Sequence, residues 1–398
     1  MNQTRTQGRG GTNALPILIT RIAICIFAVS QTMLAPLITR IGADFDLGLG
    51  GSGFLFTAYY ISNIFFCLVT GKIIAVCGKR RAMFGGLALY AAVTFAFARA
   101  HAFAAACVCM TCMGALATFI EAVGMDLVDD MAESDAAENL TMTHGIAGIG
   151  MVGGVTYSGL MLSAGYDWRM IYTVLSMAVA AIAVVFLLTR FPRMHASASG
   201  SVRELFGWLT RRELYPTYAA LFLYVGAEGA VTGWLATFMT DNLGYSALAA
   251  SLATGAVWAV VTVGRIVCAR LVGVTYTVRT LVSFLTVLCA AGVLLAAGVS
   301  SPVLFWAALV LIGAGLSGQW PLIASTALGS DQNGGTAMSM ILFFGYFGAA
   351  VIPYLIGLVG DAAGLRVALA VSAAVFLALG AVVRFVMPRP ISEKRSEG

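Results

Sequence analysis

Long apolar stretches, separated by short polar segments, dominate the pattern of hydrophobic and polar positions along this chain. Each stretch is about 20 residues long, the length of helix that crosses the hydrocarbon core of a membrane. Polar and apolar residues do not alternate as they would in the strands of a membrane β-barrel. The pattern predicts an all-α polytopic membrane protein. Twelve helices are expected, over residues 15–39, 52–76, 82–99, 102–127, 139–164, 168–190, 215–239, 246–271, 279–299, 302–328, 335–359 and 365–387.

The longest polar connection divides these helices into two groups of six. Residues 191–214 form this connection, which is expected to be a cytoplasmic central loop with a short basic amphipathic helix over 203–213. The sequence therefore predicts an N-terminal bundle over residues 1–190 and a C-terminal bundle over 215–398. No connection is long enough to form a soluble catalytic domain.

The composition supports a membrane protein and excludes several other classes. Hydrophobic residues make up 60% of the chain and charged residues 10%, whereas soluble proteins carry about 25% charged residues. Such a chain could not cover its apolar surface in water. We therefore expect a lipid bilayer around it, and we exclude a soluble enzyme and a nucleic-acid-binding protein.

The basic residues indicate which helix ends face the cytoplasm. If the N-terminus is inside, eighteen Lys and Arg residues fall in inner segments. Outer segments then hold four, which are Arg40, Arg99, Arg169 and Arg366. Because positively charged segments favour the cytoplasmic side, we expect a multi-pass protein of the cytoplasmic membrane with both termini inside. We expect no removable signal peptide.

Sequence motifs narrow the function to transport. The chain lacks the G-x-x-x-x-G-K-[ST] motif that binds nucleotide phosphates, and it has no recognisable nucleophile–base pair or cluster of metal ligands. Cys107, Cys109 and Cys112 are interpreted as small apolar residues of a helix. We expect no enzyme activity, no cofactor and no metal. Secondary transport is the first hypothesis, and a membrane-embedded sensor or enzyme is the alternative from another class.

Two inner segments, one in each half, resemble each other. The first is Gly71–Arg81 and the second is Gly264–Arg270. Glycine permits a tight bend and cations favour the inner side, so both are interpreted as inner turns of an internal repeat. Repeats of this kind place the substrate near the membrane midplane, between the halves. The residues predicted to take part in gating are Gly71, Gly78, Arg80, Arg81, Gly264 and Arg265.

The first of these segments resembles the inner-loop signature of the major facilitator superfamily, G-x-x-x-D-[RK]-x-G-x-[RK]-[RK]. The chain keeps Gly71, Gly78, Arg80 and Arg81, but it has Ala75 in place of the aspartate that ties the two halves together in that family. The resemblance implies the major facilitator fold, with two pseudo-symmetric bundles of six helices. It also implies rocker-switch alternating access by a functional monomer.

Three shorter segments resemble the fucose:proton symporter branch of that superfamily and related sugar permeases. They are Phe119–Ala122, the run from Asn139 through His144 to Gly154, and Tyr224–Glu228. The chain departs from the fucose symporter at Thr32, where that protein has an aspartate. This resemblance implies proton-coupled import of a sugar or a similar small polar organic solute.

Charged and titratable residues inside the predicted helices are the candidates for proton coupling. Glu121 and Glu228 lie in apolar stretches, where a charge costs at least about 2.5 kcal/mol and where burial favours the neutral carboxyl. His144 is expected at a similar depth to Glu121 and could exchange protons with it. Arg21 is a possible counter-ion for Glu121 or for an anionic substrate. A purely structural hydrogen bond, ion pair or helix contact is the alternative role for each.

Sugars are bound by aromatic faces and paired hydrogen-bonding groups in a mostly apolar cleft. The residues predicted to contact the substrate are Gln31, Tyr59, Asn63, Tyr224, Trp234, Trp258, Gln319, Trp320 and Tyr346. Packing or lipid contact is the alternative role for each aromatic residue. Two other transport functions stay open: proton-coupled antiport that exports drugs or metabolites, and transport of a small organic anion.

Overall fold

The computed structural model describes residues 14–131, 136–192, 207–272, 276–328 and 335–387, and these ranges are almost entirely helical. The first half contains α1 (Ala14–Met33), η1 (Ala35–Leu37), α2 (Ile38–Asp44), α3 (Leu49–Cys77), α4 (Lys79–Phe97), α5 (Phe103–Met131), α6 (Ala136–Ser163) and α7 (Trp168–Leu188). The second half contains η2 (Arg212–Leu214), α9 (Tyr215–Leu243), α10 (Ala247–Leu271), α11 (Val278–Gly298), α12 (Pro302–Leu316), α13 (Gln319–Leu328), α14 (Gly335–Ala363), α15 (Leu365–Ala381) and η3 (Val382–Val386). Ten of the described helices are long and apolar enough to cross a membrane, or up to eleven if the bent α3 is one span. The predicted all-α polytopic class is confirmed.

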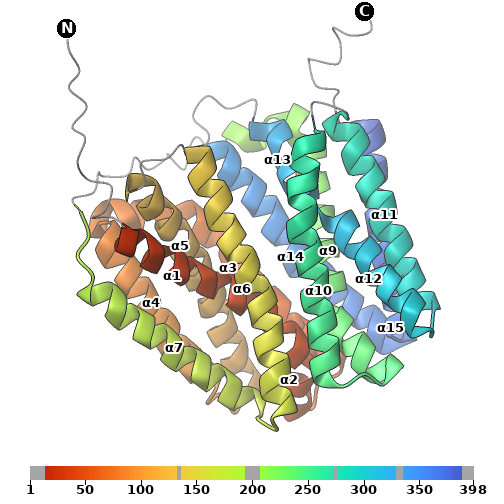
Figure 1. Ribbon diagram of the computed structural model, residues 1–398, viewed down its shortest axis with the longest axis horizontal. Coiled ribbons are helices and arrows are strands. Elements are labelled where there is room, and N and C mark those ends of the chain that lie inside the picture. Colours follow the sequence, from red (N-terminus) through yellow and green to blue (C-terminus); the bar gives the residue numbers. More distant parts are fainter. Residues whose placement is uncertain (1–13, 132–135, 193–206, 273–275, 329–334, 388–398) are drawn as a thin grey trace, which may run out of the picture.

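The helices form two groups, which we call the N-terminal bundle (α1–α7) and the C-terminal bundle (α9–α15). Helices α1, α4, α5 and α7 lie on one side of the molecule and α11, α12 and α15 on the other (Figure 1). Between them, α3 packs against α14 and α6 packs against α10. We call the end where α3 begins and α14 ends the outer end, and the opposite end the inner end, as the charge distribution predicts.

Polar residues at the helix starts explain where several of these elements begin. The Asp167 side chain accepts a hydrogen bond from the Met170 backbone N–H at 2.8 Å at the start of α7. Ser246 and Thr277 cap α10 and α11 in the same way, each at 3.2 Å. Such caps satisfy backbone N–H groups that have no partner within the helix.

Two predicted spans are interrupted, which corrects the expectation of one continuous helix in each. The span 15–39 breaks after Met33 and passes through η1, which contains Pro36, before α2 continues it to Asp44. Proline has no N–H and clashes with the carbonyl four residues before it. The span 302–328 divides at Ser317–Gly318, where Gly318 has a φ of 70° that glycine adopts without strain.

The two inner segments interpreted as turns are mostly helical, which is a second correction. Gly71 lies inside α3 and Gly264 lies inside α10. Within the segment Gly71–Arg81 the chain turns only at Gly78, which has a φ of 77° and joins α3 directly to α4. Gly264 instead packs closely against Ser317 between α12 and α13. The glycine in the second half therefore serves helix packing rather than a bend.

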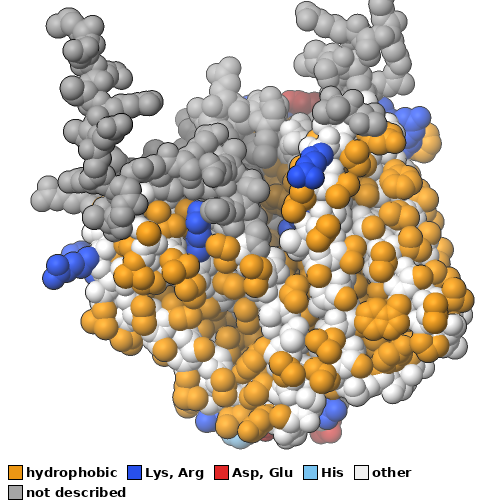
Figure 2. Space-filling view, in the orientation of Figure 1, with side chains coloured by type: hydrophobic (Ala, Val, Ile, Leu, Met, Phe, Trp, Pro, Cys, Tyr) orange, Lys and Arg blue, Asp and Glu red, His pale blue; other side chains and the backbone are white. Residues whose placement is uncertain are grey.

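Large apolar side chains cover the outside of the helices. Phe65, Phe284 and Leu188 have exposed fractions of 63%, 61% and 77%. In the space-filling view, hydrophobic side chains spread over the flank of the molecule, and basic ones lie toward its ends (Figure 2). Apolar surface of this extent suits contact with lipid rather than water.

Candidate functional site

The two bundles contact each other from the middle of the molecule to the outer end. Near the middle, the ring of Tyr60 on α3 stacks on that of Tyr346 on α14, with centroids 6.2 Å apart. Toward the outer end, the hydroxyl of Thr57 donates to the Ala350 carbonyl at 2.5 Å. Any polar group on the facing sides of α3, α9 and α14 therefore lies where the bundles meet.

Glu228, near the middle of α9, is an acidic residue of this interface. The Tyr224 hydroxyl donates to Glu228 Oε1 at 2.6 Å and also lies 3.0 Å from the Leu316 carbonyl oxygen. Arg265 of α10 in its own bundle and Tyr60 across the interface lie near enough to affect the Glu228 carboxyl group electrostatically. Glu228 thus has its hydrogen bond within the C-terminal bundle and has polar groups of both bundles near it.

Gln31 of α1 adds a polar side chain from the N-terminal bundle to the residues around Glu228. Its Nε2 donates to the Tyr60 hydroxyl at 3.2 Å. Its Oε1 is buried and has no hydrogen-bond partner in the described part of the chain. We call Gln31, Tyr60, Glu228, Arg265 and Tyr346 the interface cluster. Of these, only Tyr60 is absent from the residues predicted from the sequence.

Two residues predicted to contact substrate are directed into the N-terminal bundle instead. The Tyr59 hydroxyl lies 3.4 Å from Ser30 Oγ, which also bonds the Tyr90 hydroxyl. The Asn63 amide, oriented to satisfy its neighbours, donates to the Gly114 carbonyl at 2.9 Å and accepts from Thr118 at 3.0 Å. Both side chains are buried and join helices of one bundle.

The predicted residues of the C-terminal bundle occupy different places. Trp234 is fully buried and lies at the outer contact between the bundles, where it packs on Phe56. The Gln319 side chain accepts a hydrogen bond from the Thr286 hydroxyl at 3.0 Å and donates one to the Gly315 carbonyl at 2.5 Å. The second bond gives this carbonyl a partner at the break between α12 and α13. Trp258 belongs to α10 and its side chain is buried, whereas the side chain of Trp320 in α13 is half-buried.

Glu121 is half-buried on the face of α5 directed toward α1 and α3. Thr118, one turn before it, bonds Asn63 of α3, and Gly124, one turn after it, packs against Ile24 of α1. No hydrogen bond or ion pair within the described residues joins Glu121 to Arg21. His144 falls in α6, and its side chain lies outside the described residues.

Of the cations predicted to take part in gating, Arg80 binds within the N-terminal bundle at the inner end. Arg80 donates to the carbonyls of Leu187 and Thr189 at 2.9 and 3.0 Å, and so ties α4 to the end of α7. The neighbouring Lys79, absent from the prediction, forms an ion pair with Asp130 of α5 at 2.8 Å. Arg81 is exposed.

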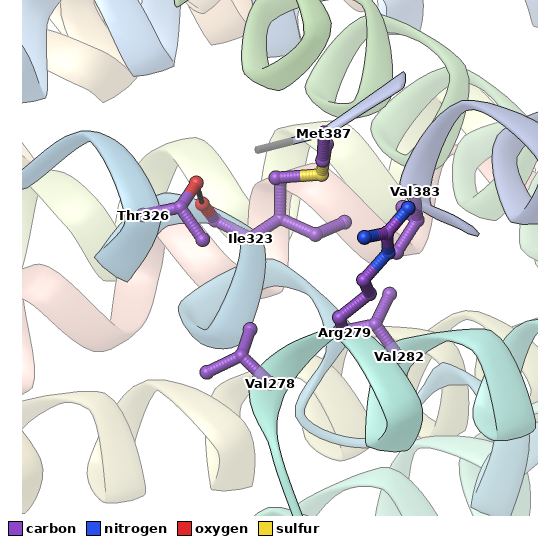
Figure 3. Close-up of a pocket in the computed structure, with 7 residues that line it drawn as sticks. All are labelled: Val278, Arg279, Val282, Ile323, Thr326, Val383 and Met387. Carbon is purple, nitrogen blue, oxygen red and sulfur yellow. Dashed lines mark hydrogen bonds between the residues drawn. The ribbon is translucent and has the colours of Figure 1, made fainter. Parts of the chain in front are cut away.

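A pocket at the inner end lies apart from the interface cluster. It is lined by residues of α11, α13 and η3, with Arg279 beside Val282 and Val383 (Figure 3). None of the residues predicted to contact substrate lines it.

Comparison with known sequences identifies one family. Residues 21–353 match the family described as the Major Facilitator Superfamily. No curated protein matches the chain.

Solved transporters share the arrangement of helices. FucP in its outward conformation aligns with a TM-score of 0.64 and 20% identity over 95% of this chain and 100% of its own, and so does a variant of the E. coli fucose:proton symporter FucP. The nucleoside transporter NupG gives a TM-score of 0.75 at 12% identity, covering 92% of this chain and 98% of its own. The human organic anion transporter MFSD10 gives 0.67 at 17% identity, with the same coverage. At these identities the likeness shows the fold.

Proposed function

Because the chain belongs to the major facilitator superfamily, whose members are membrane transporters and not enzymes, we propose that it is a proton-coupled symporter. It imports a sugar or a similar small polar organic solute by rocker-switch alternating access. The observation that carries this proposal is the interface cluster, in which a carboxyl group, a guanidinium, an amide and two aromatic rings lie where the bundles meet.

The cluster has the groups that a hydroxyl-bearing solute requires. Tyr60 and Tyr346 contribute a stacked aromatic pair, and Gln31 Oε1 is a buried acceptor without a partner in the described residues. A buried unsatisfied acceptor costs about 1–3 kcal/mol, so a solute hydroxyl that donates to it gains affinity. Binding here would engage both bundles, as alternating access requires.

Two carboxyl groups are candidates for carrying the coupled proton. Glu228 contributes to the interface cluster, and Glu121 lies in α5 of the N-terminal bundle, where no ion pair among the described residues joins it to Arg21. A carboxyl group that is protonated when accessible from outside and deprotonated when accessible from inside couples solute movement to the proton gradient. His144 remains a proposed proton partner of Glu121.

The positive-inside distribution of charges supports placement in the cytoplasmic membrane with both termini inside. We propose residues 191–214 as the cytoplasmic connection between two bundles that work together as a functional monomer. Gly71, Gly78, Arg80, Arg81 and Gly264 keep their proposed part in gating at the inner helix ends.

Uptake by proteoliposomes that are acidic outside tests the proposal. The panel consists of small sugars, nucleosides and small organic anions, and the variants are Glu228→Gln and Glu121→Gln. Wild type should accumulate one neutral polar solute when the gradient is present. A variant that lacks the coupling carboxyl should lose accumulation, by at least about tenfold, but keep solute counterflow, because exchange needs no net proton transfer.

The matched control is Glu213→Gln, which removes an exposed carboxyl group just before α9. It should accumulate the solute as wild type does. If both the Glu228→Gln and the Glu121→Gln variants also accumulate the solute normally, neither residue carries the proton and the coupling proposal is wrong. If a lipophilic cation leaves the vesicles against the gradient and no sugar enters, the antiport function replaces symport.

One further observation favours an organic anion as the second candidate substrate. Arg21 and Arg265, one in each bundle, each have a buried Nε atom with no hydrogen-bond partner in the described part of the chain. A carboxylate on the solute would supply charge-assisted hydrogen bonds to such groups. In the same panel, uptake of an anion that Arg265→Gln abolishes would assign this substrate class in place of a neutral sugar.

A further inference from the structure

Asp361, near the end of α14, binds the start of α3 across the bundle interface. Its Oδ1 accepts from the Leu49 backbone N–H at 2.6 Å, and its Oδ2 accepts from that of Gly50 at 2.7 Å. Helix α3 begins at Leu49, and the preceding Gly48 has no side chain that could cap it. The first N–H groups of a helix lack partners within it and form its positive dipole end. Asp361 therefore supplies from the C-terminal bundle the cap that α3 lacks.

Glycines on both helices make this contact possible. A Cβ atom at Gly48 would lie 2.7 Å from Asp361 Oδ1, and one at Gly50 would lie 2.9 Å from Oδ2. On the opposite helix, a Cβ atom at Gly357 would lie 2.9 Å from the Leu49 carbonyl oxygen. A larger residue at Gly357 would push the backbones of α3 and α14 apart, whereas one at Gly48 or Gly50 would displace the Asp361 side chain from its contact.

A layer of packing lies directly behind the contact. The Trp234 indole donates to the Pro353 carbonyl at 2.9 Å, which orients its ring. That ring lies edge-on to Phe56, with centroids 6.1 Å apart, and fills the space between Gly53 and Gly357. The outer end is thus closed by a polar contact with an apolar layer beneath it.

We propose that Asp361 is a gating residue that holds the outer end closed and releases α3 when that end opens. This inference rests on the proposed alternating access. The carboxylate reaches Leu49 and Gly50 only while the bundles touch at the outer end, so the contact stabilises the outer-closed arrangement alone. On opening, water can solvate both the carboxylate and the freed N–H groups, which keeps the release reversible.

Distances between spin labels on the outer loops test this role. His101 and Ser300 are exposed in the loops before α5 and before α12, one in each bundle. Both are labelled as cysteines in a background whose native cysteines are alanine, and pulsed electron paramagnetic resonance is recorded in nanodiscs. Long distances report an open outer end and short distances a closed one. Asp361→Ala should raise the ratio of open to closed molecules about tenfold, which is the effect expected from losing one charged cap. Asp361→Asn should shift it in the same direction by less.

Two further variants separate the gating role from simple helix capping. Asp241→Asn is the matched control, because Asp241 lies at the outer end of α9 and bonds Thr240 of its own helix at 2.8 Å. It should leave the distances unchanged. Gly48→Ser, added to Asp361→Ala, gives α3 its own cap. The long distances should persist, since that cap makes no link to α14.

Unchanged distances in both Asp361 variants would overturn the proposal, and so would full restoration by Gly48→Ser. The distances are recorded without solute and without a proton gradient. A failure of the transport assay would therefore contradict the proposed function while leaving this measurement intact.

Discussion

At the scale of single residues, helix geometry decides which neighbouring side chain reaches the interface. Successive residues of a helix point about 100° apart. Tyr59 therefore reaches Ser30 inside the N-terminal bundle, while Tyr60 reaches Gln31 and Tyr346 at the interface. The sequence prediction named Tyr59 as a substrate contact and left out Tyr60, because α3 is apolar on all sides and gives no sign of which ring faces the other bundle.

The two adjacent tyrosines provide a matched pair of variants. Tyr60→Phe removes the hydroxyl that Gln31 binds and disturbs the interface cluster, so the KM for the solute should rise about fivefold, as expected for one lost hydrogen bond. Tyr59→Phe removes an equivalent hydroxyl inside one bundle and should leave the KM unchanged. Initial uptake rates over a range of solute concentrations measure both. If both variants changed the KM equally, the position of Tyr60 at the bundle interface would have no special part in solute binding.

The amides at Asn63 and Gln319 show why polar residues in apolar helices are ambiguous. Each needs a partner away from water, and the sequence cannot tell whether that partner is the substrate or the protein. The structure supplies protein partners for both, Gly114 and Thr118 for Asn63 and Thr286 and Gly315 for Gln319. Gln31 differs, because its Oε1 has none among the described residues.

At the scale of elements, hydropathy locates the helices better than it locates their breaks. Most predicted ranges match a helix to within a few residues, as 279–299 matches α11. The break at Pro36 was missed because apolar residues continue on both sides of it, and the break at Gly318 because Ser317, Gly318 and Gln319 interrupt the apolar run only briefly. A membrane tolerates such interruptions where neighbouring helices satisfy the freed backbone groups, and Gln319 does so for the Gly315 carbonyl.

Glycine positions within the helices predict unequal effects of the same substitution. A methyl group at Gly114 of α5 would overlap the Tyr59 carbonyl of α3, whereas one at Gly153 of α6 would meet nothing within 4 Å. Gly114→Ala should therefore lower the free energy of unfolding by about 1–3 kcal/mol. Gly153→Ala should leave it unchanged or raise it slightly. Thermal unfolding in detergent compares the two, and an equally stable Gly114→Ala protein would contradict the close packing of α3 on α5.

At the scale of the whole molecule, the sequence indicated two bundles but not how they touch. Asp361 and Leu49 fell in segments assigned to outer loops, outside the predicted spans, yet they join α14 to α3 across more than 300 residues of chain. Pairing between distant helices depends on shape and backbone geometry, which leave no periodic pattern in one sequence. The same is true of the interface cluster, whose members come from five helices.

Proton movement driven by the solute tests the central claim most directly. Proteoliposomes contain a pH-sensitive dye and start without a gradient, and the solute identified by the uptake panel is added outside. Symport predicts acidification of the lumen by wild type and none by the carboxyl variant that lost gradient-driven uptake. Alkalinisation of the lumen, or solute entry with no change in pH, would contradict proton-coupled symport.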